Sequence, residues 1–300
     1  MTFPTGRQLD IAQGGQEATI TELGAGLRRY AVDGLDVVHG YATDEPVSGG
    51  RGQQLVPWPN RIRDGRYPWA GKTQQLWLTE PPRHNASHGL VRYVPWAVVE
   101  HGDSHVVCEV TVYPQPGWTG ILHARLTYRL AEDGLHVTLD ATNVGPAEVP
   151  FGYGAHPYLT VGETAVDEVR LTVPAASRLE VDDRLLPVAV SPVDGTGLDL
   201  RAGAPVGDRV LDTAYTDLAR EADGGWTVRL EREERYAELW ADASFGWAQV
   251  FTGEPKRGVG LAVEPMTCGP DAFNEGPTHA GMRVLAPGET YTGRWGVRGR

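Results

Sequence analysis

Hydrophobic and polar residues alternate in several segments of this chain with the two-residue period of a β-strand. Hydrophobic side chains occupy every second position from 122 to 130 and, after a Glu-Asp-Gly sequence, from 135 to 139. Because neighbouring side chains of a strand point to opposite faces of a sheet, this segment predicts a hairpin with one buried face. Alternation at 226–230 and the run GWAQVF at 246–251 predict further strands, the second with polar and aromatic side chains facing inward.

Turn signals separate these segments. The chain contains 38 glycines and 22 prolines, and turn-forming sequences recur at 32–35, 63–66, 132–135, 222–225 and 286–289. Such sequences favour tight reversals and leave little room for long helices. The pattern predicts an all-β fold, a sandwich of antiparallel sheets. No repeat or linker divides the chain, so one domain spanning 1–300 is expected, with the charged run 231–235 as a solvated turn or strand edge.

Composition argues against several classes of protein. The formal net charge is −12 and no basic run is interleaved with aromatic residues, so nucleic acid is not an expected partner. The start of the sequence has no leader-like pattern and no stretch of about 18 apolar residues occurs, which argues against secretion and membrane insertion. Cys108 and Cys268 form no disulfide or metal-binding pattern. We therefore expect a cytoplasmic protein with reduced thiols, no cofactor and no metal.

A first polar cluster lies at 58–69, where Asn60 and Arg61 stand among aromatic residues. A planar guanidinium beside aromatic faces suits a polyhydroxylated ring, because it offers fixed donors to hydroxyl groups while the aromatic faces stack on C–H groups. The alternative is a surface arginine paired with Asp64.

A second cluster, at 84–90, contains His84 and His88. Their spacing imitates a metal-binding pair, but it brings two side chains together only on a helix, and the flanking prolines and glycine argue against one. His88 is therefore predicted to be either a hydrogen-bonding ligand of a sugar or a structural histidine.

Two further clusters lie in the second half of the chain. His156 follows two glycines and precedes a proline, where a strand is expected to end. With an ordinary pKa of about 6.5, a histidine there could transfer protons near neutrality or could simply be structural.

Glu264 follows the apolar run 259–263 and is predicted at the end of a buried strand, either functional or paired with an arginine. Partial burial would raise the pKa of its carboxyl group, as a general base requires. Asp212 is a second candidate carboxylate, with an ordinary turn aspartate as the alternative.

The order of these motifs resembles the aldose 1-epimerase family over the whole chain. No P-loop, nucleophile elbow or dinucleotide-binding glycine motif competes with this interpretation. The resemblance implies a large antiparallel β supersandwich and the interconversion of the α and β anomers of a free hexose such as glucose or galactose. It is carried by Asn-Arg-Ile at 60–62, His-Gly at 88–89, His-Pro-Tyr at 156–158, the glutamate at 264 with Pro-Asp-Ala-Phe-Asn at 270–274, and strand-like segments at 20–41 and 284–297.

The resemblance also assigns roles to individual residues. His156 is expected to be the general acid and Glu264 the general base. The expected sugar-binding residues are Asn60, Arg61, His88, Asp212 and Gln249. In many galactose mutarotases the aspartate is followed by histidine and the glutamate by Thr-Gln, whereas Thr213 and Pro265-Met266 stand here, which leaves the preferred sugar open.

Three alternatives remain at this stage. A hexose-6-phosphate 1-epimerase would need extra cations at the site, which Arg63, Arg66, Arg83 and Arg92 lie close enough in sequence to supply. A non-catalytic sugar-binding or sugar-sensing protein would keep the pocket but would need no matched acid and base. A glycoside hydrolase would use Asp212 and Glu264 as its pair of carboxylates. A small-molecule sugar is the expected partner, and the protein is expected to be a monomer or homodimer.

Overall fold

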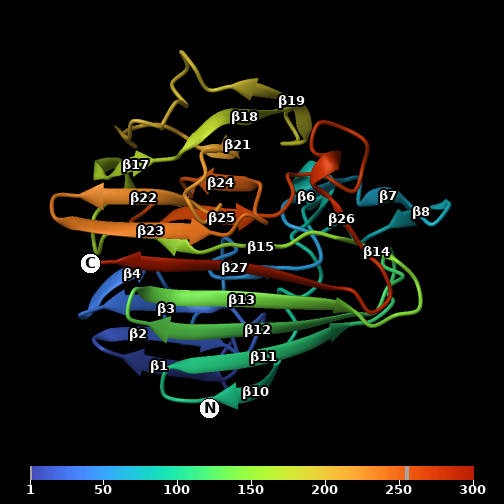
Figure 1. The fold of residues 1–300 in the computed structure, drawn as a ribbon, viewed down its shortest axis with the longest axis horizontal. Coiled ribbons are helices and arrows are strands. Elements are labelled where there is room, and N and C mark those ends of the chain that lie inside the picture. Colours follow the sequence, from blue (N-terminus) through green and yellow to red (C-terminus); the bar gives the residue numbers. More distant parts are fainter. Residues whose placement is uncertain (1, 254–256) are drawn as a thin grey trace.

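The computed structural model describes residues 2–253 and 257–300, and this part of the chain consists almost entirely of strands and turns. Figure 1 shows the long strands running side by side across the molecule, with short hairpins at one end. The prediction of an all-β fold is confirmed. Among the described residues the helical segments are three short 3₁₀ turns, η1 (Pro81–Arg83), η2 (Val166–Glu168) and η3 (His279–Gly281). None of the described helices is long and apolar enough to cross a membrane.

The first sheet contains twelve strands among the described residues, and its neighbouring strands pair antiparallel. In spatial order its main path is β1 (Gln8–Gln13), β2 (Gln16–Thr21), β3 (Leu27–Val32), β4 (Leu35–Val38), β16 (Tyr158–Leu159), β25 (Leu261–Met266), β24 (Trp247–Phe251), β21 (Asp212–Leu218), β18 (Ala175–Val181) and β19 (Pro187–Pro192). Beside this path, β15 (Gly154–Ala155) pairs with β25 and with β5 (Gln54–Leu55).

The second sheet contains nine of the described strands. They are β10 (Ala97–His101), β11 (His105–Val112), β12 (Leu122–Ala131), β13 (Gly134–Asn143), β27 (Thr290–Gly299), β23 (Arg235–Ala241), β22 (Trp226–Arg232), β17 (Arg170–Thr172) and β20 (Ala204–Pro205). Three two-stranded ribbons complete the described fold: β14 (Val149–Phe151) with β26 (Arg283–Leu285), β6 (Arg61–Arg63) with β9 (Asn85–Ser87), and β7 (Arg66–Trp69) with β8 (Lys72–Gln75).

The predicted hairpin is confirmed as β12 and β13. Their register brings Leu130 opposite Leu135, and the alternating hydrophobic side chains of both strands are buried. The strands predicted at 226–230 and 246–251 are also present, as β22 and β24. The charged run 231–235 spans the end of β22, the turn at 233–234 and the start of β23. Local alternation identified β12, β13 and β22 because each has one face on the hydrophobic core, whereas β24 was predicted from a continuous run and is buried on both faces.

A chain of buried hydrogen bonds crosses the core between the two sheets. The Trp295 indole N–H donates to the Tyr153 hydroxyl, which donates to Oε1 of Gln54. The side-chain amide of Gln54 donates to the Tyr128 hydroxyl, which donates to the carbonyl oxygen of Ala25. Because every polar group in this chain has a partner, these side chains are buried without the usual cost of an unpaired donor or acceptor.

Candidate active site

Glu264 lies in the middle of the first sheet. It belongs to β25, directly opposite Gln249 of β24, and its side chain is 3% exposed. The prediction that Glu264 ends its strand is wrong, because β25 continues through Pro265 to Met266. Proline usually stops a central strand since it lacks an N–H group. Here Pro265 stays in register with Ala248 of β24, and the next residue, Met266, is paired on both sides.

His156 occupies the short break between β15 and β16, as the glycine and proline around it predicted. Its Nε2 atom lies 3.2 Å from Oε1 of Glu264, and the two side chains are 6% and 3% exposed. The Tyr158 ring stacks on the imidazole with centroids 5.3 Å apart and an angle of 14° between the planes. On another side lies Gly50, where a Cβ atom would come within 2.8 Å of Cδ2 of His156, so only glycine fits.

Burial shifts the two groups of this pair in opposite directions. Removal from water raises the pKa of Glu264 well above its ordinary value, and the nearby charge of Asp212 acts in the same direction. Burial lowers the pKa of His156 to about 3, and Arg92 contributes to this decrease. One acid and one base need one proton in total, and these two shifts favour its residence on Glu264 rather than on His156 when the cavity is empty.

His88 has a defined tautomer. Its backbone is in the left-handed region, with φ of 62°, and its Nδ1 atom accepts the backbone N–H of Asn60 at 3.1 Å. Burial lowers the pKa of His88 well below the ordinary value, so the ring is neutral and its remaining proton is on Nε2. The ring lies edge to face with that of His156, with centroids 5.6 Å apart. His88 is thus placed as a neutral hydrogen-bond donor, whereas the exposed His84 pairs with Asp64.

A row of polar side chains runs from the ribbon β6–β9 to the first sheet. Asp212 accepts from the side-chain amide of Gln249 at 2.6 Å, and Oε1 of Gln249 faces the Asn60 amide at 3.4 Å. Arg61 donates to Oδ1 of Asn60 and holds Glu80 through two hydrogen bonds of 2.8 and 3.1 Å. The alternative pairing of Arg61 with Asp64 is therefore wrong. Fixed donors and acceptors in one row suit the hydroxyl groups of a sugar ring.

All seven residues selected from the sequence line a single cavity of about 320 Å³. Asp212 stands at the start of β21 and takes part in the cavity wall, so it is not an isolated turn residue. Sequence reasoning did not find several other lining residues, among them Thr79 and Glu80, since neither stands in a motif that indicates ligand binding. Phe251 was predicted only as part of the inward-facing run 246–251. The cavity is lined by Gly49, Gly50, Asn60, Arg61, Thr79, Glu80, Ser87, His88, Arg92, Tyr93, His156, Asp212, Gln249, Phe251 and Glu264.

One group of side chains in this cavity has the composition of a metal site. Among the described residues, His88, His156 and Glu264 bring potential ligand atoms within 4.8 Å of one another. A ligating imidazole must offer a lone pair, but Nδ1 of His88 already accepts the Asn60 N–H and Nε2 then carries the proton. The tautomer of His88 suits hydrogen bonding to a substrate better than coordination of a cation.

Fold and site together define a β-sandwich protein with a polar, sugar-sized cavity built around a buried carboxyl–imidazole pair. The model of the aldose 1-epimerase family matches residues 7–298, so the chain belongs to that family. This result confirms the resemblance noted in the sequence.

Individual relatives support the same placement. The Escherichia coli K12 protein YihR, described as uncharacterized, is 32% identical over 273 residues that cover 91% of this chain and 87% of YihR. Human galactose mutarotase is 25% identical over 287 residues, covering 86% of this chain and 80% of the human protein. A solved Caenorhabditis elegans structure, described as a GalM/aldose epimerase homologue, superimposes with a TM-score of 0.85 at 22% identity and covers 98% of each chain.

Proposed function

We propose that this protein is an aldose 1-epimerase, a mutarotase that interconverts the α and β anomers of a free hexose such as glucose or galactose. The observation that supports this best is the pair His156 and Glu264, in contact at 3.2 Å and lining a cavity whose other walls are rich in hydroxyl-binding groups. The family supports a carbohydrate epimerase in general terms. The free hexose, the residue roles and a cytoplasmic location are parts of the proposal.

The chemistry requires only proton transfers. The Glu264 carboxylate removes the proton of the anomeric hydroxyl while the His156 imidazolium protonates the ring oxygen, and the ring opens to an aldehyde. Rotation about C1–C2 and closure in reverse give the other anomer. The single proton of the pair is on Glu264 in the empty site; a bound sugar favours its transfer to His156, because its hydroxyl groups donate to the carboxylate and its ring oxygen accepts from the imidazolium.

The remaining residues hold the ring in place. We assign donation from Nε2 of His88 to an oxygen near the ring oxygen, since Nδ1 is already engaged by Asn60. Arg61 and Asn60 bind hydroxyl groups from one side and Asp212 and Gln249 from the other, in the row described above. These groups are connected to one another by hydrogen bonds before a ligand arrives, so little ordering is needed on binding.

Polarimetry of freshly dissolved α-D-glucose and α-D-galactose tests the proposal. The purified protein should accelerate the approach to the equilibrium rotation at a pH where spontaneous mutarotation is slow, and the ratio between the sugars would begin to define specificity. Binding of hexoses without acceleration would replace the proposal with a sugar-binding or sugar-sensing protein. Release of reducing sugar from a glycoside would instead favour a hydrolase that uses Asp212 and Glu264.

A hexose-6-phosphate 1-epimerase is the second candidate, and one cation favours it. Arg92 lines the cavity and donates only to neutral acceptors among the described residues, Oε1 of Gln53 and the carbonyl oxygen of Ser87, at 3.4 and 3.3 Å. Burial lowers the pKa of Arg92 although the charge of Glu80 acts in the opposite direction, which reflects the cost of holding a buried charge that donates only to neutral acceptors. An anionic group on the sugar would remove that cost.

The other three arginines that the sequence suggested are engaged elsewhere. Two of them pair with residues outside the cavity lining, and the third pairs with Glu80, which belongs to that lining. Arg63 pairs with Asp271, Arg66 with Gln75, and Arg83 with Glu80. The comparison of glucose 6-phosphate with glucose, in the wild type and in Arg92→Gln, decides between the two substrates. A preference for the phosphate that Arg92→Gln removes would establish the second candidate.

A further inference from the structure

Glu80 lies in the wall of the catalytic cavity, but its carboxylate has no acceptor position left for a ligand. An ionised carboxylate offers roughly four lone-pair positions. Oε1 accepts from Arg61 and Arg83 at 3.1 and 3.0 Å, and Oε2 accepts from Arg61 and Asn85 at 2.8 and 3.3 Å. Because these hydrogen bonds fill the available positions, Glu80 acts on a bound sugar through its neighbours and not by direct contact.

The surrounding chain fixes this carboxylate in place. The backbone N–H of Glu80 donates to the carbonyl oxygen of Asn85, and the N–H of Asn85 donates to that of Glu80, at 3.0 and 3.3 Å. Asn85 is fully buried, and its side-chain oxygen accepts from Arg184, in the turn between β18 and β19, at 3.2 Å. Glu80 is therefore held from two parts of the fold before a ligand arrives, unlike an ordinary surface carboxylate.

The hydrogen bonds to Glu80 determine which donors Arg61 can offer to a ligand. A guanidinium group carries five N–H groups in a fixed plane. Nε and Nη2 of Arg61 each donate to Glu80, and Nη1 donates to Asn60, so three of the five are in use. Two N–H groups remain, one on Nη1 and one on Nη2, in a side chain that lines the cavity. Arg61 thus meets a sugar as one half of an ion pair and not as an isolated cation.

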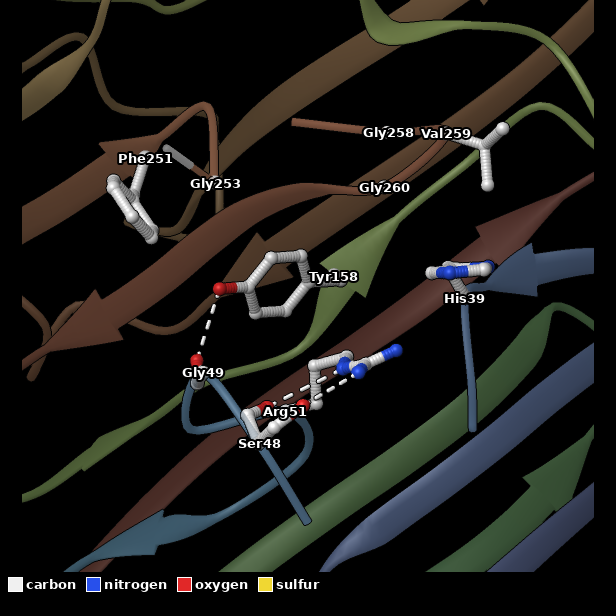
Figure 2. Close-up of a pocket in the computed structure, with 10 residues that line it drawn as sticks. All are labelled: His39, Ser48, Gly49, Arg51, Tyr158, Phe251, Gly253, Gly258, Val259 and Gly260. Carbon is white, nitrogen blue, oxygen red and sulfur yellow. Dashed lines mark hydrogen bonds between the residues drawn. The ribbon is translucent and has the colours of Figure 1, made fainter. Parts of the chain in front are cut away.

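Two other arginines at or beside the cavity are held without a carboxylate. Arg92 donates only to neutral acceptors among the described residues, as set out above. Figure 2 shows Arg51, in the wall of a neighbouring cavity, with its guanidinium group held by the hydroxyl and carbonyl oxygens of Ser48 at 2.7 and 3.3 Å. Neutral acceptors are therefore sufficient to orient an arginine in this part of the fold. What Glu80 adds at Arg61 is a negative charge.

The charge of Glu80 also acts on other groups of the cavity wall. Burial raises the pKa of Asp212, and the charge of Glu80 acts in the same direction. Burial lowers the pKa of Arg92, and the charge of Glu80 opposes this decrease. Both effects have the sign of a negative potential inside the cavity, and such a potential disfavours an anionic ligand.

We propose that Glu80 is a positioning and specificity residue, which fixes the two remaining donors of Arg61 and balances its charge, so that the cavity favours a neutral sugar over a sugar phosphate. This inference rests on the proposed function, since it concerns the sugars on which that function acts. Loss of the Glu80 charge would leave Arg61 and Arg92 as two unbalanced cations in the cavity wall and would shift the preference towards an anionic sugar.

Three variants separate the charge of Glu80 from its geometry. Glu80→Gln keeps the size of the side chain and removes its charge, whereas Glu80→Asp keeps the charge and shortens the side chain. Glu238→Gln is the matched control, because Glu238 also accepts from two arginines, Arg229 and Arg298, but lies outside the cavity lining. The side chains of Glu80 and Glu238 are similarly shielded, at 18% and 13% exposure.

The measured quantity is the ratio of kcat/KM for glucose 6-phosphate to kcat/KM for glucose. The wild type should favour glucose. In Glu80→Gln the ratio should rise about tenfold or more, as expected for the loss of one charge close to the ligand, and added salt should reduce this rise. Glu80→Asp should raise KM for both sugars and leave the ratio unchanged, since only the position of Arg61 is disturbed. Glu238→Gln should behave as the wild type.

Several outcomes would overturn the inference. Equal losses with both sugars in Glu80→Gln would make Glu80 a purely structural residue. The same rise of the ratio in Glu80→Asp or in Glu238→Gln would show that the charge at this position is not the cause. A wild type that prefers glucose 6-phosphate would also refute the inference, and this measurement needs no variant to fold. Circular dichroism checks the fold of each variant.

A binding measurement separates this inference from the proposed function. Calorimetric titration with glucose and glucose 6-phosphate, in Glu264→Gln and in the double variant Glu264→Gln, Glu80→Gln, does not depend on catalysis. If the wild type accelerated no mutarotation but the second substitution shifted binding towards glucose 6-phosphate, the role of Glu80 would stand and the epimerase would be refuted. Rapid mutarotation of glucose with a ratio that ignores Glu80 would retain the epimerase and refute the role of Glu80.

Discussion

Nε2 of His156 lies 3.2 Å from Oε1 of Glu264, so the proposed acid and base touch each other when no substrate separates them. The other oxygen of Glu264, Oε2, is buried and has no hydrogen-bond partner among the described residues. A buried carboxyl oxygen without a partner is costly for stability. We interpret this cost as a consequence of holding the carboxyl group of Glu264 against His156 in the wall of the cavity.

Removal of either member of this pair should abolish catalysis. Glu264→Gln keeps the size of the side chain but cannot accept a proton, and His156→Asn cannot donate one. We expect each variant to lower kcat/KM in polarimetry by about 10²–10⁴-fold, the usual contribution of a general acid or base. Circular dichroism should show an unchanged fold. Wild-type catalysis by either folded variant would refute the assignment of both roles.

The pH profile should reflect a pair that shares one proton. Gain of a second proton is governed by the lowered pKa of His156, about 3, and loss of the single proton by the raised pKa of Glu264. Activity should therefore persist well below the ordinary histidine pKa of about 6.5 and fall only where the pair gains or loses a proton. The measurement is kcat/KM against pH, corrected for spontaneous mutarotation. An acidic limb centred near 6.5 would show that His156 titrates as an independent, solvated histidine.

Arg61 should contribute to substrate binding through its geometry as well as its charge. Two of its nitrogen atoms donate to Glu80, and Nη1 donates to Oδ1 of Asn60 in the cavity wall. A lysine keeps the charge but cannot hold the carboxylate with two parallel bonds and also reach a hydroxyl group. We expect Arg61→Lys to raise KM about tenfold with a smaller effect on kcat, a loss of about 1–2 kcal/mol.

Arg63→Lys is the matched control for this prediction, because Arg63 pairs with Asp271 and does not line the cavity. Its kinetic constants should stay within twofold of the wild type. A similar rise in KM in both variants would mean that Arg61 acts only through the stability of the ribbon β6–β9.

The sequence predicted the elements whose signals are local. Alternation around the turn at 132–135 identified β12 and β13, because burial of one face leaves its period in the sequence. The family resemblance selected seven residues that line one cavity, but not their partners. The tautomer of His88 depends on the N–H of Asn60, 28 positions away, and Gln249 meets Asn60 across 189 positions. Such contacts follow from the packing of the whole sandwich, and no local pattern encodes them.

The buried chain of hydrogen bonds through Tyr153 should be a major source of stability. In Tyr153→Phe the ring remains, but the indole N–H of Trp295 loses its acceptor and Oε1 of Gln54 loses its donor. Both groups are buried, so each is left without compensation by water. We expect the free energy of unfolding to fall by about 2–4 kcal/mol, from about 1–2 kcal/mol for each unpaired group.

Urea denaturation measures this change as a lower midpoint with an unchanged slope. Tyr113→Phe removes the same atom from a side chain that is 65% exposed, and it should change the free energy of unfolding by less than about 0.5 kcal/mol. Equal stability of the two variants would show that this chain of hydrogen bonds is dispensable. A loss of stability confined to Tyr153→Phe would show that the hydrogen bonds help to hold the two sheets together. Because Tyr153 is not part of the catalytic cavity lining, the folded variant should keep its mutarotase activity.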